Sequence, residues 1–200
     1  MRDLEIRGAG SILSETQSGH IAAVGIDLYT ELVADAVNKL KGETADEDEP
    51  EPVRIDLYAD AHLPDSYVSG VETRLEAYRR LAAAMTHGAV DDVAAEWEDR
   101  FGPLPDEAVE LIEAARLRVE AIRIGITEIV QNRREVKIGP VSLKASQEVR
   151  LERIARGSLL RGSTLYLKPP AESPATAIAE FLRTMWPASV DSASEGSASQ

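Results

Sequence analysis

Apolar residues in the first part of the chain recur at helical spacing. Between Asp27 and Leu40 they fall three and four residues apart, which is the spacing of one face of an α-helix. The positions concerned are Tyr29, Leu32, Val33, Ala36, Val37 and Leu40. Acidic side chains then dominate residues 43–52, which contain no branched aliphatic, methionine or aromatic residue. Such a composition repels itself and cannot pack, so the sequence predicts a helix over 27–40 followed by an acidic linker.

Alternation of apolar and polar residues marks the start of the main body of the chain. Val53, Ile55 and Leu57 alternate with polar side chains and predict a strand over 53–58. Helical periodicity follows in three segments, each with its apolar residues on one stripe. The predicted helices are 71–86, 90–101 and 105–125, interrupted at His87-Gly88 and at Gly102-Pro103. Glycine and proline end helices, so these dipeptides set the predicted boundaries.

Period-two patterning returns in the last third of the chain. Residues 126–131 and 135–138 alternate around a polar turn and predict a hairpin. The remaining predicted elements are a helix over 145–155, a strand over 163–168 and a helix over 174–185, followed by a disordered tail of serine and alanine over 188–200. This order predicts an α+β fold, in which a small mixed sheet packs with several helices. The expected divisions are a helical segment over 1–42, the linker over 43–52, one domain over 53–187 and the tail.

Composition narrows the classes of function. The 22 Lys and Arg residues face 35 Asp and Glu residues, a formal charge of −13, which disfavours binding to nucleic-acid phosphates by this chain. The absence of cysteine excludes disulfide frameworks, thiolate zinc sites and cysteine nucleophiles, and it is typical of a reducing cytoplasmic compartment. No apolar run has the length of a signal-peptide core or of a membrane span, so we expect a cytoplasmic protein without a membrane partner.

Catalytic motifs are weak or missing. His20, His62 and His87 are far apart in sequence, and the pair Asp60 and His62 supplies too few ligands to predict a metal site. Phosphate-binding loops of the GxxxxGK[ST] type and nucleophile elbows do not occur. We therefore predict no catalytic residue, no metal and no cofactor. A carboxylate site formed by Asp56, Asp60 and His62 is the weakest of three hypotheses for function.

The first 42 residues carry a specific resemblance. The run DLEIRGAGSILSETQSGHIAAVGIDLYTELVADAV closely resembles the end of the translocase module of bacterial transcription-repair coupling factors (Mfd). That family motif follows the last helicase motif and helps to convert ATP hydrolysis into movement along DNA. Arg7 and Gln17, in the spacing R-G-A-G-x-x-x-x-x-x-Q, match its arginine and glutamine. In the family they link a helical hairpin, which this sequence lacks, to the loop that follows.

The resemblance continues through the runs PDSYV, RLEAYRRLA, EWEDRFGPLPDEAVELI and ARLRVEAIRIGI. It covers roughly residues 1–140, while 141–186 match more loosely. The resemblance implies that the chain is a C-terminal piece of a large ATP-dependent DNA translocase. That family displaces stalled RNA polymerase and recruits nucleotide excision repair through UvrA. The piece itself would be a non-catalytic, autoinhibitory domain.

The same resemblance implies a domain contact. In the family, the C-terminal domain covers the UvrA-binding domain, and Glu96 and Asp99 match acids of the motif E-x-x-D-R-F-G, which resembles part of that contact. On the predicted helix both acids lie opposite Trp97 and Phe101, so we expect them to be free to face a partner. Two exposed acids on a helix are also common without any function. The alternative hypothesis is a stand-alone acidic binding protein that occupies a basic partner surface.

Overall fold

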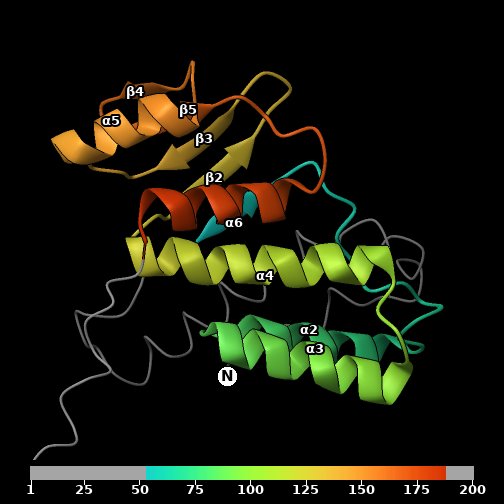
Figure 1. Cartoon of the computed structure of the whole chain (residues 1–200). Helices are drawn as coiled ribbons and strands as arrows, with labels where there is room; N and C mark the ends of the chain where they lie inside the picture. Colours follow the sequence, from blue (N-terminus) through green and yellow to red (C-terminus); the bar gives the residue numbers. More distant parts are fainter. Residues whose placement is uncertain (1–52, 188–200) are drawn as a thin grey trace, which may run out of the picture.

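The computed structural model describes residues 53–187, which form five helices and a five-stranded sheet (Figure 1). The helices are α2 (Val71–Ala83), α3 (His87–Phe101), α4 (Asp106–Ile124), α5 (Ala145–Ile154) and α6 (Pro174–Met185). The strands are β1 (Arg54–Asp56), β2 (Glu128–Gln131), β3 (Val136–Gly139), β4 (Leu159–Arg161) and β5 (Thr164–Leu167). The predicted helix over 27–40, the acidic linker and the tail lie outside the described residues.

The sheet is mixed, which confirms the predicted α+β class. Its strand order is β1-β2-β3-β5-β4, with β1 parallel to β2 and the other pairs antiparallel. The predicted hairpin of β2 and β3 is present. Its turn is held by Asn132, whose Oδ1 accepts hydrogen bonds from the backbone N–H groups of Arg134 and Glu135 at 2.9 and 3.0 Å. Asparagine favours such turns because its side chain replaces a backbone acceptor.

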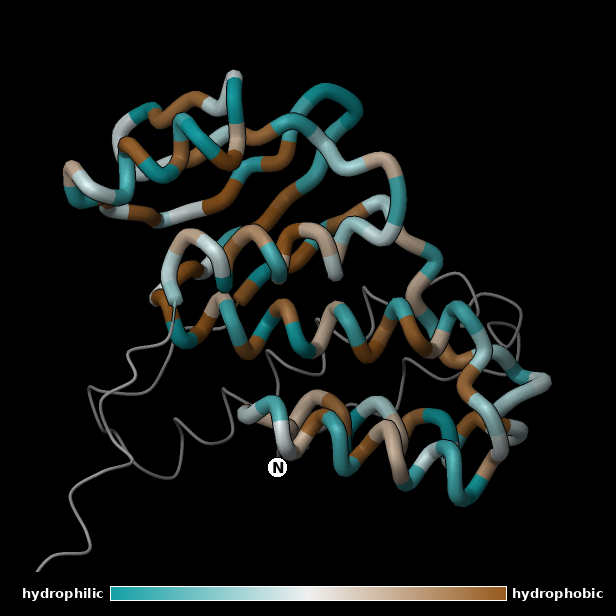
Figure 2. The backbone as a smooth tube through the Cα atoms, in the orientation of Figure 1, coloured by the Kyte–Doolittle hydropathy of each residue, from teal (hydrophilic) through white to brown (hydrophobic). Residues whose placement is uncertain are grey.

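Helix α4 lies between two hydrophobic cores (Figures 1 and 2). Its side chains Leu111 and Ala115 pack into a core with α2 and α3, while Leu117 and Ala121 pack into a second core with the sheet and α6. In the second core, alternate strand residues such as Ile138 face the helices. The intervening strand positions are only partly buried or exposed, so no helix of residues 53–187 covers the opposite face of the sheet.

A buried arginine joins α4 to the end of α2. Arg118 is 1% exposed, and its guanidinium donates hydrogen bonds to the backbone carbonyls of Leu81 and Ala84. The last carbonyls of a helix have no partner within that helix, and a cation stabilises the negative end of the helix dipole. Arg118 therefore fixes where α2 ends and how it packs on α4.

Two predicted boundaries are wrong. The helix predicted over 71–86 ends at Ala83, and His87 and Gly88 begin α3 instead of separating two helices. The reason is Thr86, whose side-chain oxygen accepts a hydrogen bond from the backbone N–H of Ala89 at 3.2 Å and caps the new helix. Glycine is tolerated there because the first N–H groups of a helix lack intrahelical partners in any case.

Strand β4 was not predicted from the sequence. All three of its residues are exposed, so it shows no alternation of buried and exposed positions. It forms because the two-residue turn Gly162-Ser163 folds it back onto β5, with Gly162 at φ 59°, a conformation that glycine adopts without strain. None of the helices in residues 53–187 combines the length and the apolar character that a membrane span requires.

Candidate domain interface

Helix α3 carries both acids of the predicted contact and is rigidly placed. Trp97 is 1% exposed and anchors the helix in the core shared with α2 and α4. At the helix end, the Phe101 ring packs edge-on against Tyr67, with ring centroids 5.8 Å apart. The Tyr67 hydroxyl donates to the Gly102 carbonyl at 2.9 Å. Because these contacts fix the rotation of α3 about its axis, they also fix which of its side chains face outward.

Glu96 does not lie free on the outer face, contrary to expectation. Its carboxylate is half-buried between α2 and α3, where Oε2 lies 2.6 Å from Arg80 Nη2 and Oε1 lies 2.9 Å from Arg100 Nη1. Arg80 belongs to α2, so the ion pair joins two helices. The sequence could not show this pairing because it depends on the packing of α2 against α3. The role of Glu96 in a domain contact stays a prediction.

Asp99 is exposed on the outward face of α3, as expected. No ion pair or hydrogen bond of its carboxylate occurs within residues 53–187. Asp92, seven residues earlier, is also exposed, and its carboxylate likewise has no partner in the described part of the chain. A spacing of seven places two residues on the same helical face. Asp92 was not among the predicted contact residues, although its spacing of seven from Asp99 is a signal visible in the sequence.

The acids on either side of Asp92 and Asp99 are held in ion pairs. On the α4 side, Arg116 Nη2 lies 2.7 Å from Asp91 Oδ1, and Arg116 also pairs with Glu113. Partial burial works to lower the pKa of Arg116, but its hydrogen bonds to Asp91 and Glu113 outweigh burial and raise it. Asp92 and Asp99 therefore form a narrow unpaired acidic stripe, bordered by Asp91 on one side and Glu96 on the other.

A second cluster of charges lies at the opposite end of α3. The buried carboxylate of Glu120 accepts a hydrogen bond from Arg123 at 2.8 Å and lies 2.7 Å from His87 Nε2. Arg183 of α6 approaches the same carboxylate at 3.7 Å. Burial works to raise the pKa of Glu120, but the hydrogen bonds from Arg123 and His87 outweigh it, so the pKa is lowered. This cluster ties α3, α4 and α6 together.

The residues of the enzyme hypothesis have separate charged partners. His62 Nδ1 lies 2.9 Å from Asp60 Oδ1, whereas the nearest charged partner of Asp56 is Arg54 at 3.7 Å. Within residues 53–187, no three side chains of the metal-ligating types come together. Arg7 and Gln17 lie outside the described residues, and their role in a translocation motif stays a prediction.

Comparison of this sequence with known proteins shows which family the chain belongs to. Residues 57–152 match the TRCF domain. The chain is 42% identical over 180 residues to the transcription-repair-coupling factors of Mycobacterium bovis and Mycobacterium tuberculosis. It belongs to the TRCF domain family. A transcription-repair-coupling factor of Staphylococcus aureus is 34% identical over 165 residues and matches 82% of this chain. The resemblance stated from the sequence is thereby confirmed.

A solved structure supports the fold of the TRCF domain. The crystal structure of the C-terminal domain of a transcription-repair coupling factor superposes with a TM-score of 0.58 at 16% identity. The match covers 66% of this chain and 91% of that one. The mycobacterial matches cover 85% of this chain but only 15% of those proteins. This chain therefore spans a small part of the length of its curated relatives.

Proposed function

We propose that this chain is the non-catalytic C-terminal part of a transcription-repair coupling factor and that its TRCF domain masks the UvrA-binding surface of the longer protein. The 42% identity over 180 residues to the mycobacterial coupling factors carries this proposal. The longer protein would be an ATP-dependent DNA translocase that displaces stalled RNA polymerase and recruits UvrA. In that setting the partner of this domain is intramolecular, and RNA polymerase, UvrA and DNA are partners of the whole protein.

The acidic stripe of α3 supports a masking contact. Asp99 lies in the last turn of α3, where the carbonyl end of the helix already carries partial negative charge. An acid is unfavourable at this end, so the stability of α3 does not account for Asp99. A basic surface on another domain would account for it. Asp92 and Asp99 would meet that surface directly, and Glu96 would lie at the edge of the contact beside Arg80 and Arg100.

The contact can be tested by isothermal titration of the chain with the UvrA-binding domain of the Mycobacterium tuberculosis relative. The double variant Asp92→Ala/Asp99→Ala should weaken binding by roughly 1 to 3 kcal/mol, because it removes charges from an interface. The matched control is Glu72→Ala/Glu76→Ala, which changes the net charge equally on exposed positions of α2. Equal losses for both variants, or none for the first, would contradict a specific contact by α3.

Masking itself needs a second measurement in the longer protein. If the TRCF domain covers the UvrA-binding surface, the Asp92→Ala/Asp99→Ala variant should bind UvrA more tightly than the unmodified protein when polymerase is absent. The Glu72→Ala/Glu76→Ala variant should bind UvrA as the unmodified protein does. Unchanged UvrA affinity in a folded α3 variant would leave the contact without a masking role.

A further inference from the structure

Positive charge is concentrated in the second half of the described chain. Residues 133–168 contain nine Lys and Arg residues against three Glu residues, whereas residues 54–124 contain fifteen acidic residues against eight arginines. Within the described residues 53–187, none of these nine cations lies at ion-pair distance from a carboxylate. Most arginines of residues 54–124 form ion pairs. Residues 133–168, called the basic region below, instead carry cations that no carboxylate of the described residues neutralises.

The basic region contains an open edge of the sheet. Among the strands of residues 53–187, β4 pairs only with β5 and is the last strand of the sheet. Arg161 and Thr164 flank a two-residue turn and so form a hydrogen-bonded pair, which leaves the N–H and C=O groups of Leu160 directed away from β5. Leu159 and Leu160 are 53% and 38% exposed. The edge therefore offers both backbone hydrogen-bonding groups and apolar surface.

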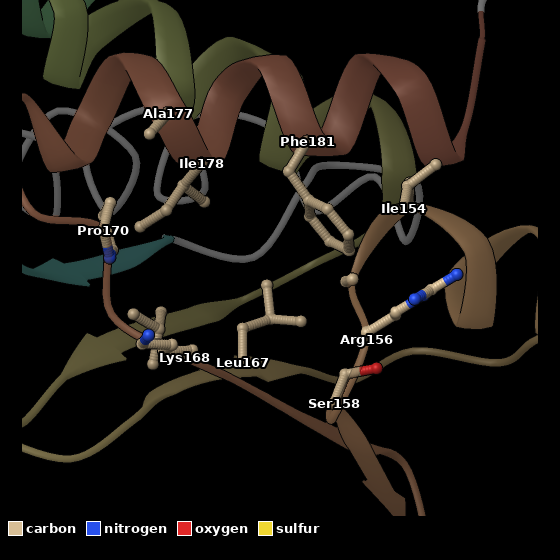
Figure 3. A pocket seen from close by; sticks show the side chains of 11 residues that line it. Ile154, Arg156, Ser158, Leu167, Lys168, Pro170, Ala177, Ile178 and Phe181 are labelled. Carbon is tan, nitrogen blue, oxygen red and sulfur yellow. The ribbon is translucent and has the colours of Figure 1, made fainter.

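A pocket of about 210 Å³, lined by apolar side chains and by the polar Arg156, Ser158 and Lys168, lies at the beginning of this edge (Figure 3). Its interior is lined by side chains of α6 and β5, with Phe181 and Ile178 directed toward Leu167. Arg156 and Ser158, in the segment that leads into β4, line the same pocket. Each side of β4 therefore offers side chains to a ligand. On the helix-covered side these are Leu160 and the lining of the pocket, and on the open side they are Leu159, Arg161 and Tyr166.

We propose that β4 is a docking edge for an extended segment of a separate partner protein in which apolar and acidic residues alternate. Such a segment would add a strand beside β4 through backbone hydrogen bonds. Because successive side chains of a strand point to opposite faces, its apolar residues would meet Leu160 and the pocket. Its acidic residues would meet Arg161 on the open side.

The surroundings of β4 favour this occupant over two others. A second copy of the chain would bring two Arg161 side chains and their basic neighbours together, and charge on an edge strand is a common means of preventing self-pairing. A nucleic acid would gain from the cations but not from the apolar side chains of the pocket or from the outward-directed backbone groups of Leu160. An acidic peptide matches the charge, the pocket and the edge at once.

The probe for this proposal is a fluorescein-labelled ten-residue peptide of alternating valine and glutamate, titrated with the full chain. We expect saturable binding by fluorescence anisotropy that weakens as salt is added. Arg156→Glu/Arg161→Glu should lower the affinity at least about tenfold, because repulsion replaces attraction at the edge. The matched control Arg133→Glu/Arg134→Glu changes the net charge equally in the turn between β2 and β3 and should lower it far less. Circular dichroism verifies that both variants fold.

Amide hydrogen exchange tests whether the peptide pairs with the backbone of β4. The amide of Leu160 should exchange with solvent rapidly in the free chain and at least about tenfold more slowly in the complex, because its N–H becomes hydrogen-bonded. N-methylation of alternate peptide residues should abolish binding without changing the charge of the peptide. The proposal is overturned by equal losses for the two charge variants or by unchanged exchange at Leu160. Tighter binding of a ten-nucleotide single strand than of the peptide, or a dimer of the chain in light scattering, would also overturn it.

Discussion

His87 Nε2 lies 2.7 Å from Glu120 Oε1, so the first residue of α3 is joined to a buried acid in the middle of the domain. The two residues are 33 positions apart in sequence. Arg123 completes the contact from the next turn of α4. Since Glu120 is almost fully buried, its charge is stable only while these donors surround it. The cluster therefore couples the position of α3 to the ionisation of a single carboxylate.

Replacing Glu120 by Gln should lower the free energy of unfolding at neutral pH by about 1.5 to 3 kcal/mol, the range for hydrogen bonds to charged groups. The pKa of Glu120 is lowered in the folded state from its usual 4.5. Its contribution is therefore present above that usual value and is lost as the pH falls through the folded pKa. Urea unfolding between pH 7 and pH 3 should show a shallower decline for Glu120→Gln. A matching decline in the variant and the unmodified chain would contradict this role, and Glu72→Gln serves as the exposed control.

Glu96 and Asp99 should differ in their effect on folding. Glu96→Ala removes two ion pairs and should lower the free energy of unfolding by about 0.5 to 1 kcal/mol, since these pairs are partly exposed. Asp99→Ala should change it by less than about 0.5 kcal/mol or raise it slightly, because an acid near a helix C-terminus is unfavourable. Thermal or urea unfolding of the two single variants compares them directly. A larger loss for Asp99→Ala than for Glu96→Ala would mean that the assignment of their surroundings is wrong.

Trp97 should be the most sensitive position of α3. Trp97→Ala should lower the free energy of unfolding by about 3 to 5 kcal/mol, because it leaves a cavity between α3 and α4. Trp97→Phe keeps part of the volume and should lose less. Urea unfolding followed by circular dichroism gives both values. A loss below about 1 kcal/mol for the alanine variant would show that α3 is not held by this core.

Gly125 and Gly88 should respond in opposite directions to alanine. Gly125 ends α4 at φ 82°, and its N–H donates to the Ile122 carbonyl at 3.1 Å. Gly125→Ala should lower the free energy of unfolding by about 1 to 2 kcal/mol, because a Cβ is unfavourable in the left-handed conformation. Gly88 lies in the first turn of α3 with open space around it, so Gly88→Ala should be neutral or stabilise by up to about 1 kcal/mol. Thermal unfolding of both variants distinguishes backbone strain from general sensitivity to substitution.

The purified chain should neither hydrolyse ATP nor bind duplex DNA tightly. Its sequence contains no phosphate-binding loop of the GxxxxGK[ST] type, and its formal charge of −13 opposes the phosphate backbone. A coupled ATPase assay with and without DNA, together with anisotropy of a labelled duplex, checks both expectations. DNA-stimulated ATP hydrolysis by the chain would contradict the non-catalytic role.

The sequence by itself determined the types and order of most elements. Helical stripes such as the one that includes Val90 and Trp97 are dictated by burial of one face, and the alternation at Ile55 follows from a half-buried strand. Local patterns of this kind depend on neighbouring residues only. Glu96 and Asp99 could be singled out without a structure because they lie in a continuous run, E-x-x-D-R-F-G, that resembles a family motif. The family could also be stated from the sequence because its motifs are continuous runs.

Only the tertiary structure decided which charges are paired and which are free. Glu96 is held by Arg80 of α2, while Asp92 and Asp99 are left as the unpaired stripe, because the packing angle of two helices sets which side chains meet. Helix α4 has a second buried face, with Leu117 and the polar Glu120, because it separates two cores. Strand β4 exists through its pairing with β5 and leaves no pattern in the sequence. These features arise from contacts between residues far apart in the chain, which local periodicity does not encode.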